Sequence, residues 1–175
     1  PNFEAPTDVG ANNVYNVQVT ASDGTNSTNQ ALAITVTAVN DNDPVITTAA
    51  TANFAENATG TVIDVNATDA DLPAQTLTFS ITGGADAAKF AINATTGIVT
   101  FVASPNFESP TDVGADNVYD LTVTASDGAR TTSQNIAVTV TPVNEFSPVF
   151  TSSATANVAE NASGTVLTVQ ANDAD

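Results

Sequence analysis

The fold is decided by one stretch of strict alternation, Tyr119-Asp120-Leu121-Thr122-Val123-Thr124-Ala125. Apolar side chains occupy every second position, and polar side chains lie between them. This is the pattern of a β-strand with one face in the core and the other in water. Turn residues at 126–128 end the strand, and a second alternating run follows with Ile136, Val138 and Val140. The two runs predict the last two strands of a β domain.

The composition agrees with a β fold. Val, Ile and Thr recur throughout, whereas only 6% of the residues are aromatic, which favours many thin strands with small side chains. No long stretch places apolar residues at i, i+3, i+4 and i+7, so no amphipathic helix is expected. Apolar residues make up 42% of the chain, which is enough for a core.

The chain repeats itself at an interval of 104 residues, since Pro1 aligns with Pro105 and Pro44 with Pro148. Residues 1–24 match residues 105–128 at 19 of 24 positions, and residues 44–71 match residues 148–175 at 19 of 28 positions. A unit of this length has the size of a small β-sandwich. We therefore expect one whole repeat at 44–147. Residues 1–43 are the C-terminal part of a preceding repeat, and residues 148–175 are the N-terminal part of a following one.

The whole repeat carries signals for about seven strands, with turn residues between them. The expected strands lie at 45–53, 61–66, 77–81, 90–93, 97–102, 119–125 and in the run that contains 136–140, with one helical turn near 86–90. Short strands at close spacing predict an all-β fold of the immunoglobulin-like type. More specifically, they predict a seven-strand antiparallel Greek-key sandwich in tandem repeats, rather than a parallel α/β fold.

The charge balance restricts the partners and the chemistry. Nineteen acidic residues face two basic ones, Lys89 and Arg130, giving a net charge of −17. Phosphate groups of nucleic acids and anionic membrane surfaces both require Lys and Arg, so neither is an expected partner. The chain has no Cys and no His, which excludes disulfides, most zinc, copper and haem sites, and His-dependent catalytic triads. No apolar run approaches the roughly 18 residues that span a membrane.

The acidic side chains gather at the ends of expected strands. Successive antiparallel strands deliver their loops to opposite poles of a sandwich, which predicts two groups. One group is Asp69, Asp71 and Asp127, and the other is Glu56, Glu108, Asn144 and Glu145. Carboxylates that converge without Lys or Arg repel one another unless a metal lies between them. Ca²⁺ takes six to eight oxygen ligands and suits such groups. Each motif alone also fits an ordinary solvated turn, and acidity alone also favours solubility.

Five motifs in this order resemble the extracellular cadherin repeat in its bacterial cadherin-like form. They are Asn40-Asp41-Asn42-Asp43-Pro44, Ala55-Glu56-Asn57, Asp69-Ala70-Asp71, Asn106-Phe107-Glu108 and Ala125-Ser126-Asp127-Gly128. The resemblance covers the whole repeat and both flanking segments. It implies a seven-strand Greek-key sandwich and tandem domains with Ca²⁺ at each joint. The ligands then come from the domain before the joint, the linker and the domain after it.

Carried over position by position, the resemblance implies two sets of calcium ligands. The first joint would use Glu4, Asn40, Asp41, Asn42, Asp69, Asp71 and Asp127. The second joint would use Glu56, Glu108, Asn144, Glu145, Asp173 and Asp175. Ala38 and Pro142 stand where the family's linker begins with Asp, and Phe146 stands where it ends with Asn. Because fewer charged ligands weaken Ca²⁺ binding, we expect the first joint to bind more tightly than the second.

These features predict a calcium-stiffened structural repeat of a large secreted or surface adhesin or filament, which attaches cells to surfaces or to one another. Neighbouring repeats of the same chain or of other copies are the expected partners, including end-to-end assembly. The chain begins in the middle of a repeat, so we expect it to be a segment of a longer protein.

Two other classes of function are weighed against this one. A carbohydrate-binding module is the alternative, although two Tyr and eight Phe offer few aromatic platforms for sugars. An enzyme is not expected, because the acidic residues recur with the repeats instead of forming one catalytic pair.

Overall fold

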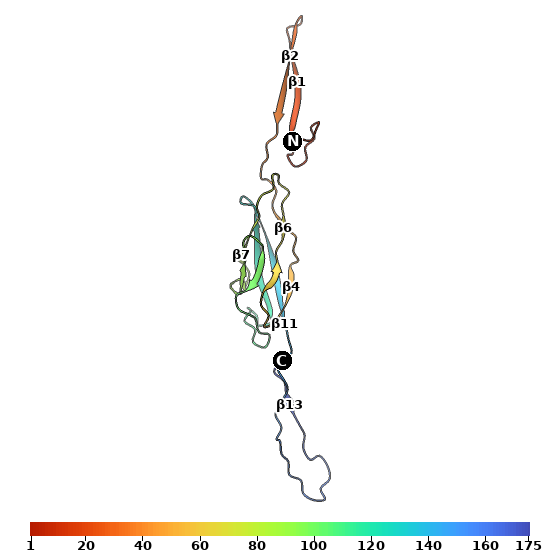
Figure 1. Ribbon diagram of the computed structural model, residues 1–175, viewed down its shortest axis with the longest axis vertical. Coiled ribbons are helices and arrows are strands. Elements are labelled where there is room, and N and C mark those ends of the chain that lie inside the picture. The colour runs from red at the N-terminus through yellow and green to blue at the C-terminus, as the bar shows by residue number, and fades with distance from the viewer.

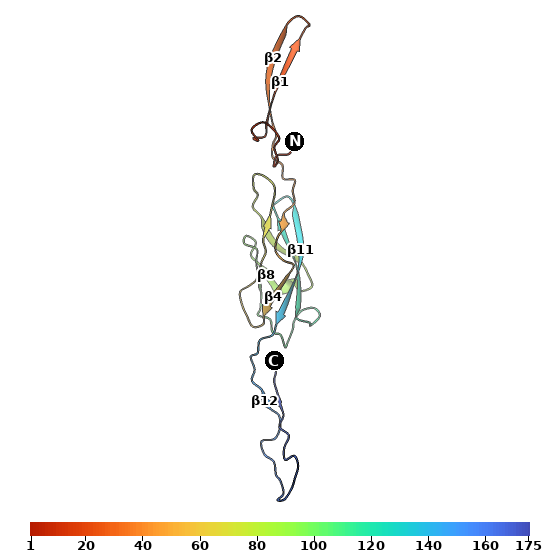
Figure 2. The ribbon, with the colours of Figure 1, turned by 90° about the vertical axis from the view of Figure 1, so that its right-hand side faces the viewer.

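The computed structural model describes residues 1–175 and shows a long, narrow molecule (Figure 1). A β-sandwich forms its middle, a two-stranded hairpin extends from one end, and a long loop extends from the other. A view at right angles shows the same narrow outline, so the three parts lie in a row (Figure 2). This row follows the order of the three segments in the sequence.

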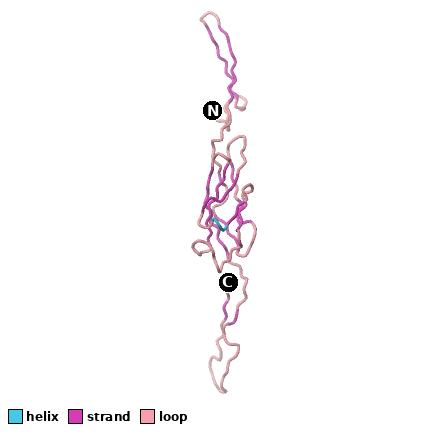
Figure 3. The backbone as a smooth tube through the Cα atoms, turned by 90° about the vertical axis from the view of Figure 1, so that its left-hand side faces the viewer, coloured by secondary structure: helices cyan, strands magenta, loops and turns pink.

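The sandwich consists of two main sheets and one short pair of strands. The larger sheet has the order β4 (Thr51–Ala55), β11 (Thr131–Thr141), β10 (Val118–Ser126) and β7 (Thr78–Gly83). The smaller sheet has the order β5 (Thr61–Asp64), β9 (Ile98–Phe101) and β8 (Phe90–Ile92), and β3 (Val45–Ile46) pairs with β6 (Ala67–Thr68). One 3₁₀ turn, η1 (Ala87–Lys89), is the only helical element (Figure 3). The predicted all-β sandwich is confirmed.

The first predicted strand, 45–53, is wrong in its extent. The structure splits it into β3 and β4, because the chain leaves one sheet and joins the other between them. The N–H of Thr47 donates to the Asn66 carbonyl at 2.9 Å, whereas the Ala50 carbonyl accepts from the N–H of Ala137 at 3.0 Å. The second predicted strand, 61–66, is shorter in the structure, where β5 ends at Asp64. The pairing of β4 with β11 is parallel, while every other pairing in the sandwich is antiparallel.

The core lies where the alternating stretch predicted it. The apolar side chains of β10 and β11 that face inward are buried: Tyr119, Leu121, Val123, Ala125, Ile136, Val138 and Val140. Phe90 and Phe101 from the smaller sheet pack against each other with ring centroids 4.5 Å apart, and Phe101 meets the ring of Tyr119 edge-on. Burying an aliphatic or aromatic side chain of this kind stabilises the fold by about 1.5–3 kcal/mol.

The N-terminal segment forms a hairpin of β1 (Val14–Ser22) and β2 (Ser27–Thr35). It corresponds to β10 and β11 through the 104-residue repeat, yet Val17 and Leu32, the counterparts of Leu121 and Ile136, are exposed. In the C-terminal segment only β12 (Val149–Phe150) and β13 (Ala171–Asn172) are paired. No helix in the structure has the length and apolar character needed to cross a membrane.

Candidate metal centres at the two joints

The first joint brings together the carboxylates that the sequence assigned to one pole. Asp69 and Asp71 follow β6, and Asp127 follows β10, so the two loops meet at the same end of the sandwich. Oxygen atoms of these three side chains lie within 4.8 Å of one another. Asp71 and Asp127 are buried, at 1% and 8% exposure. The sandwich therefore places three carboxylates in a compact group next to the linker.

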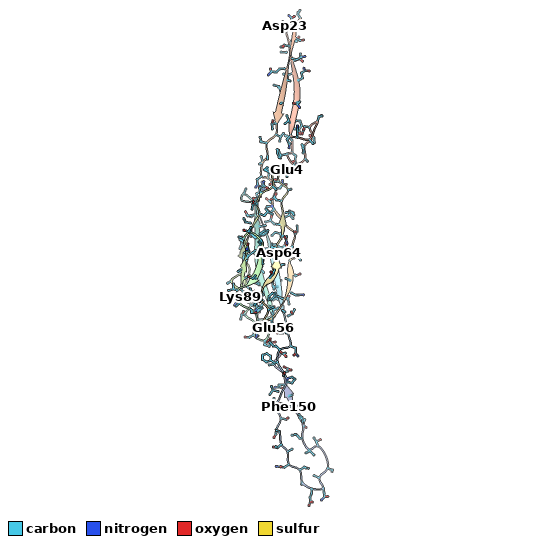
Figure 4. All side chains as sticks on the ribbon, in the orientation of Figure 1. Glu4, Asp23, Glu56, Asp64, Lys89 and Phe150 are labelled. Carbon is cyan, nitrogen blue, oxygen red and sulfur yellow. The ribbon has the colours of Figure 1, made fainter.

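A second group at this joint joins three parts of the chain. Oxygens of Glu4, from the N-terminal segment, and Asp41, from the linker, lie within 4.8 Å of an oxygen of Asp71. Figure 4 places Glu4 just above the sandwich. The N–H of Leu72 donates to Oε1 of Glu4 at 3.4 Å, which is a direct bond between the N-terminal segment and the sandwich. Asp71 belongs to both carboxylate groups and is the centre of the joint.

The linker residue Asn42 contacts Asp71 as a hydrogen-bond donor, which differs from the predicted role of a metal ligand. Its backbone N–H lies 3.2 and 3.1 Å from the two carboxylate oxygens of Asp71, and its side-chain nitrogen donates to Oδ1 of Asp71 at 2.5 Å. Burial raises the pKa of Asp71, but these hydrogen bonds and others from Asp41 together bring it below its usual value. Asn42 therefore acts on the site as a hydrogen-bond donor that fixes Asp71.

The donor set at the first joint fits a hard cation. Oδ2 of Asp69 is buried and has no hydrogen-bond partner. The amide of Asn40 can stand in two orientations: with its nitrogen inward it donates to Oδ2 of Asp71 at 3.3 Å and to Oδ2 of Asp127 at 3.1 Å. With its oxygen inward, the same position adds an oxygen to the carboxylate group. An all-oxygen set of this charge and flexibility suits Ca²⁺.

An ion pair at the first joint was not foreseen from the sequence. Nη1 of Arg130 lies 2.9 Å from Oδ1 of Asp43, and both side chains are partly exposed. Asp43, and more weakly Asp41 and Asp71, raise the pKa of the Arg130 guanidinium. Arg130 lies three residues after Asp127, which places it at this pole, but its partner Asp43 is 87 residues away in the sequence. The backbone N–H of Arg130 also donates to Asp127, and this bond is the main cause of the lowered pKa of that carboxyl.

The second joint gathers a smaller group. Oxygens of Glu56, Glu108 and Glu145 lie within 4.8 Å of one another, and of the three only Glu56 is buried. Figure 4 shows Glu56 at the lower end of the sandwich. Oδ1 of Asp175 accepts from the N–H groups of Glu145 and Phe146 at 3.0 and 3.1 Å. Asp175 thus contacts its linker as Asp71 does at the first joint.

Two other predicted residues of the second joint lie apart from this group. Asp173 accepts a hydrogen bond only from the N–H of Ala174, at 2.9 Å, and is not among the grouped carboxylates. Asn144 makes no side-chain hydrogen bond, whereas Asn57, which is not one of the predicted ligands, donates to Oε2 of Glu145 at 2.5 Å. The ligand role of every residue at both joints stays a prediction.

At the second joint, the surroundings lower the pKa of Glu56 and raise the pKa of Glu108. The N–H groups of Phe107 and Val143 donate to Glu56 at 2.7 and 2.8 Å and lower its pKa. The backbone N–H of Glu108 lowers the pKa of its own carboxyl, but partial desolvation, a hydrogen bond with Glu56 and the charges of Glu56 and Glu145 together raise it above its usual value. The Glu108 carboxylate is therefore the one that bears the repulsion within this group.

Known proteins resemble this chain in sequence and in structure. A family model described as Cadherin domain matches residues 50–141. Human Cadherin EGF LAG seven-pass G-type receptor 1 is 34% identical over 157 residues, which is 85% of this chain and 5% of that receptor. Halomucin of Haloquadratum walsbyi is 40% identical over 76 residues, which is 42% of this chain and 1% of halomucin. The solved structure of Protocadherin Gamma B7 extracellular cadherin domains 1-4 covers 92% of this chain and 41% of its own, with a TM-score of 0.67 and 26% identity.

These similarities confirm the fold and the broad class. Cadherin domains are extracellular adhesion repeats and not enzymes, and they bind Ca²⁺ in general. The bacterial form of the resemblance stays a prediction, since the receptor is a human protein and halomucin comes from an archaeon. The chain spans only 5% of the length of the receptor it resembles. Its fold and the family match over residues 50–141 lead to one conclusion: the chain belongs to the cadherin family.

Proposed function

We propose that this chain is a calcium-stiffened structural segment of a large extracellular adhesin or surface filament. One observation carries the proposal: Glu4, Asp41 and Asp71 bring oxygens from the N-terminal segment, the linker and the sandwich within 4.8 Å of one another. A cation held by this group is bonded to all three parts of the chain at once. Rotation about the linker is then restricted, because any rotation separates its ligands.

The residues of the joint explain why stiffness depends on the cation. Glu4, Asp41 and Asp71 repel one another, and so do Asp69, Asp71 and Asp127, because each group is purely anionic. Arg130 and the amides of Asn42 offset only part of this repulsion. When bound, Ca²⁺ supplies the positive charge that the side chains lack and takes oxygen ligands from both sides of the joint. Extracellular Ca²⁺ then favours a straight rod, and chelation favours a flexible chain.

The neighbours of the sandwich are further repeats, of the same chain or of other copies. The hairpin exposes Val17 and Leu32 on a face whose counterpart in the sandwich is buried by the smaller sheet. In the C-terminal segment, Val149 and Phe150 are exposed in the same way. Further repeats supply the surfaces that cover these apolar residues. Repeats joined in series form an extended stalk, which suits attachment of cells to surfaces, as in a biofilm, or to one another.

The test combines a thermal melt with small-angle X-ray scattering, each in Ca²⁺ and in chelator. At a Ca²⁺ concentration about 100 times the Kd, binding stabilises the folded state by about 2.7 kcal/mol. For a chain of this size the Tm then rises by about 5–10 °C. Scattering should show a narrower distribution of shapes and a larger maximum dimension in Ca²⁺.

The matched variants are Asp71→Asn, in the centre of the joint, and Asp120→Asn, an exposed carboxylate on the outer sheet face with the same change of charge. Asp71→Asn should lose most of the Ca²⁺ response, and Asp120→Asn should keep it. The proposal is wrong if Ca²⁺ changes neither the Tm nor the scattering of the unmodified chain.

A further inference from the structure

The feature that carries the inference is a buried asparagine next to each joint. Asn117 is 9% exposed and has a φ of +63°, in the left-handed region. Its side-chain nitrogen donates to the carbonyl of Phe107 at 3.0 Å, while its side-chain oxygen is buried and has no partner. Its backbone is held as well, because its carbonyl accepts from Val140 on β11 at 2.8 Å.

The N-terminal segment contains the same arrangement. Asn13 is 9% exposed with a φ of +63°, its side-chain nitrogen donates to the carbonyl of Phe3 at 2.9 Å, and its side-chain oxygen again has no partner. Its carbonyl accepts from Val36 at 2.9 Å. The hairpin has no second sheet packed on it, so the arrangement forms without a surrounding sandwich. It is therefore a local property of the loop and the two strands that follow.

The chemistry of the position selects asparagine. A positive φ is tolerated by Gly, Asn and Asp. Gly has no side chain to donate, and the ionised Asp side chain at neutral pH has no hydrogen to donate. Since the Phe107 carbonyl can only accept, the orientation of the Asn117 amide is fixed, and its oxygen is left without a partner. A buried oxygen without a partner is unfavourable, so the hydrogen bond to Phe107 is the interaction that this side chain provides.

The bond to Phe107 bears directly on the joint. Because a peptide group is planar, fixing the Phe107 carbonyl also fixes the N–H of Glu108 and the bond from that nitrogen to Cα of Glu108. The N–H of Phe107 is held on its other side by Oε2 of Glu56, at 2.7 Å. Phe107 thus sets the positions of two members of the Glu56, Glu108 and Glu145 group relative to each other. Asn13 holds the residue before Glu4 in the same way.

We infer that Asn117 and Asn13 are positioning residues of the second and the first joint, because each fixes the peptide that presents a glutamate, Glu108 or Glu4, to the cation. This inference rests on the proposed function. It assigns each asparagine to one joint only, which a general effect on folding would not do. Side chains that orient metal ligands typically account for about 10–100-fold in metal affinity.

The test uses Asn117→Asp and Asn13→Asp, two variants with the same change of charge, each the control for the other. A titration with Ca²⁺ is followed by ¹H–¹⁵N NMR, in which the amides of Glu145 and Phe146 report on the second joint and those of Asn42 and Leu72 on the first. Asn117→Asp should raise the Kd of the second joint about tenfold or more and leave the first within about twofold. Asn13→Asp should do the reverse.

A readout without metal accompanies the titration. In chelator, the order parameter of the Glu108 amide should fall from about 0.85 toward 0.6 in Asn117→Asp, and that of Glu4 should stay unchanged. Asn117→Gly, which accepts the positive φ but cannot donate, should shift the Kd of the second joint in the same direction. If Asn117→Asp does not fold, the Kd of Asn117→Gly at the second joint tests the inference in its place.

Three results separate the possible outcomes. A Kd at the second joint that stays within twofold in both Asn117 variants overturns the inference, and so does an equal loss at both joints. If the unmodified chain responds to Ca²⁺ at neither joint, the proposed function fails before any variant is measured, and the inference fails with it.

Discussion

The two joints of this chain are built from corresponding residues, but the carboxylates of these residues are buried and grouped to different extents. At the first joint, loops after β6 and β10 add Asp69, Asp71 and Asp127 to the linker, and two of these carboxylates are buried. At the second joint, Asp175 holds the linker as Asp71 does, yet it is exposed, and the loop after β13 adds no grouped carboxylate. The comparison teaches that the residues after a linker gather and bury their carboxylates only where they belong to a packed sandwich.

The largest expected effect comes from Asp71→Asn. Asp71 belongs to both carboxylate groups of the first joint, so its loss removes a charge from each. The Ca²⁺ affinity of the first joint should fall more than about a hundredfold, beyond what residues outside the ligand set contribute. The affinity of the second joint should not change. Calorimetric titration with joint-specific NMR signals measures both, and an equal loss at the two joints would contradict the prediction.

Phe146→Asn tests whether the second joint can be improved. Phe146 occupies the position of Asn42, whose side chain adds a hydrogen bond to Asp71 that Phe146 cannot give to Asp175. Because a hydrogen bond to a charged group contributes about 1.5–3 kcal/mol, affinity at the second joint should rise about tenfold. Phe150→Asn, an exposed residue of the same segment, is the control and should leave the Kd unchanged. A weaker second joint in Phe146→Asn would show that its side chain packs in the joint.

A smaller effect, with opposite signs in the two conditions, is expected from Arg130→Gln. Arg130 pairs with Asp43 and offsets part of the negative charge of the first joint. Without it, Ca²⁺ meets less competing positive charge, and its affinity should rise about two- to fivefold. In chelator the Tm should fall slightly, since the carboxylates lose their one cationic neighbour. Asp43→Ser, which introduces the residue found in the second linker, removes the same pair but keeps Arg130, so the chelator Tm should fall less than in Arg130→Gln. A lower Ca²⁺ affinity in Arg130→Gln would contradict this account.

The smallest expected effect is a different response of the joints to acid in chelator. The folded-state pKa values of Asp71 and Asp127 lie below 3.8, so their contribution is complete above pH 3.8 and is lost as pH falls through the lowered values. The folded-state pKa of Glu108 lies above 4.5, so stability instead rises as pH falls through that raised value toward 4.5. Melting curves from pH 7 to pH 3 should therefore show a shallow rise before the loss. Glu108→Gln should abolish the rise alone.

The sequence predicted the parts of the fold that depend on local patterns. Leu121 and Val123 alternate with threonines, and this alone places their strand and its buried face. The division of the first strand was not predictable, because it depends on partners as distant as Asn66 for Thr47 and Ala137 for Ala50. The alternation of apolar residues and the positions of turn residues do not indicate which sheet an edge strand joins.

The candidate sites likewise contain some residues that local patterns predicted and others that they did not. The grouping of Asp69, Asp71 and Asp127 followed from the direction of antiparallel strands, and the 104-residue repeat aligned Glu4 with Glu108. Asn117 was missed because its role depends on the sign of φ and on a carbonyl ten residues away. The pairing of Arg130 with Asp43 spans 87 residues and was likewise outside the reach of a local pattern.

The parallel pairing of β4 with β11 has a mechanical consequence. The chain enters the sandwich through β3 and β4 from the first joint and leaves it through β11 toward the second (Figure 2). Tension on the two linkers therefore pulls β4 and β11 in opposite directions along their length. The five residue pairs of this ladder, from Thr51 with Ala137 to Ala55 with Thr141, are loaded together in shear and cannot open one by one. Force spectroscopy should give a higher unfolding force through the linkers than across the β10–β11 hairpin, where the ladder unzips.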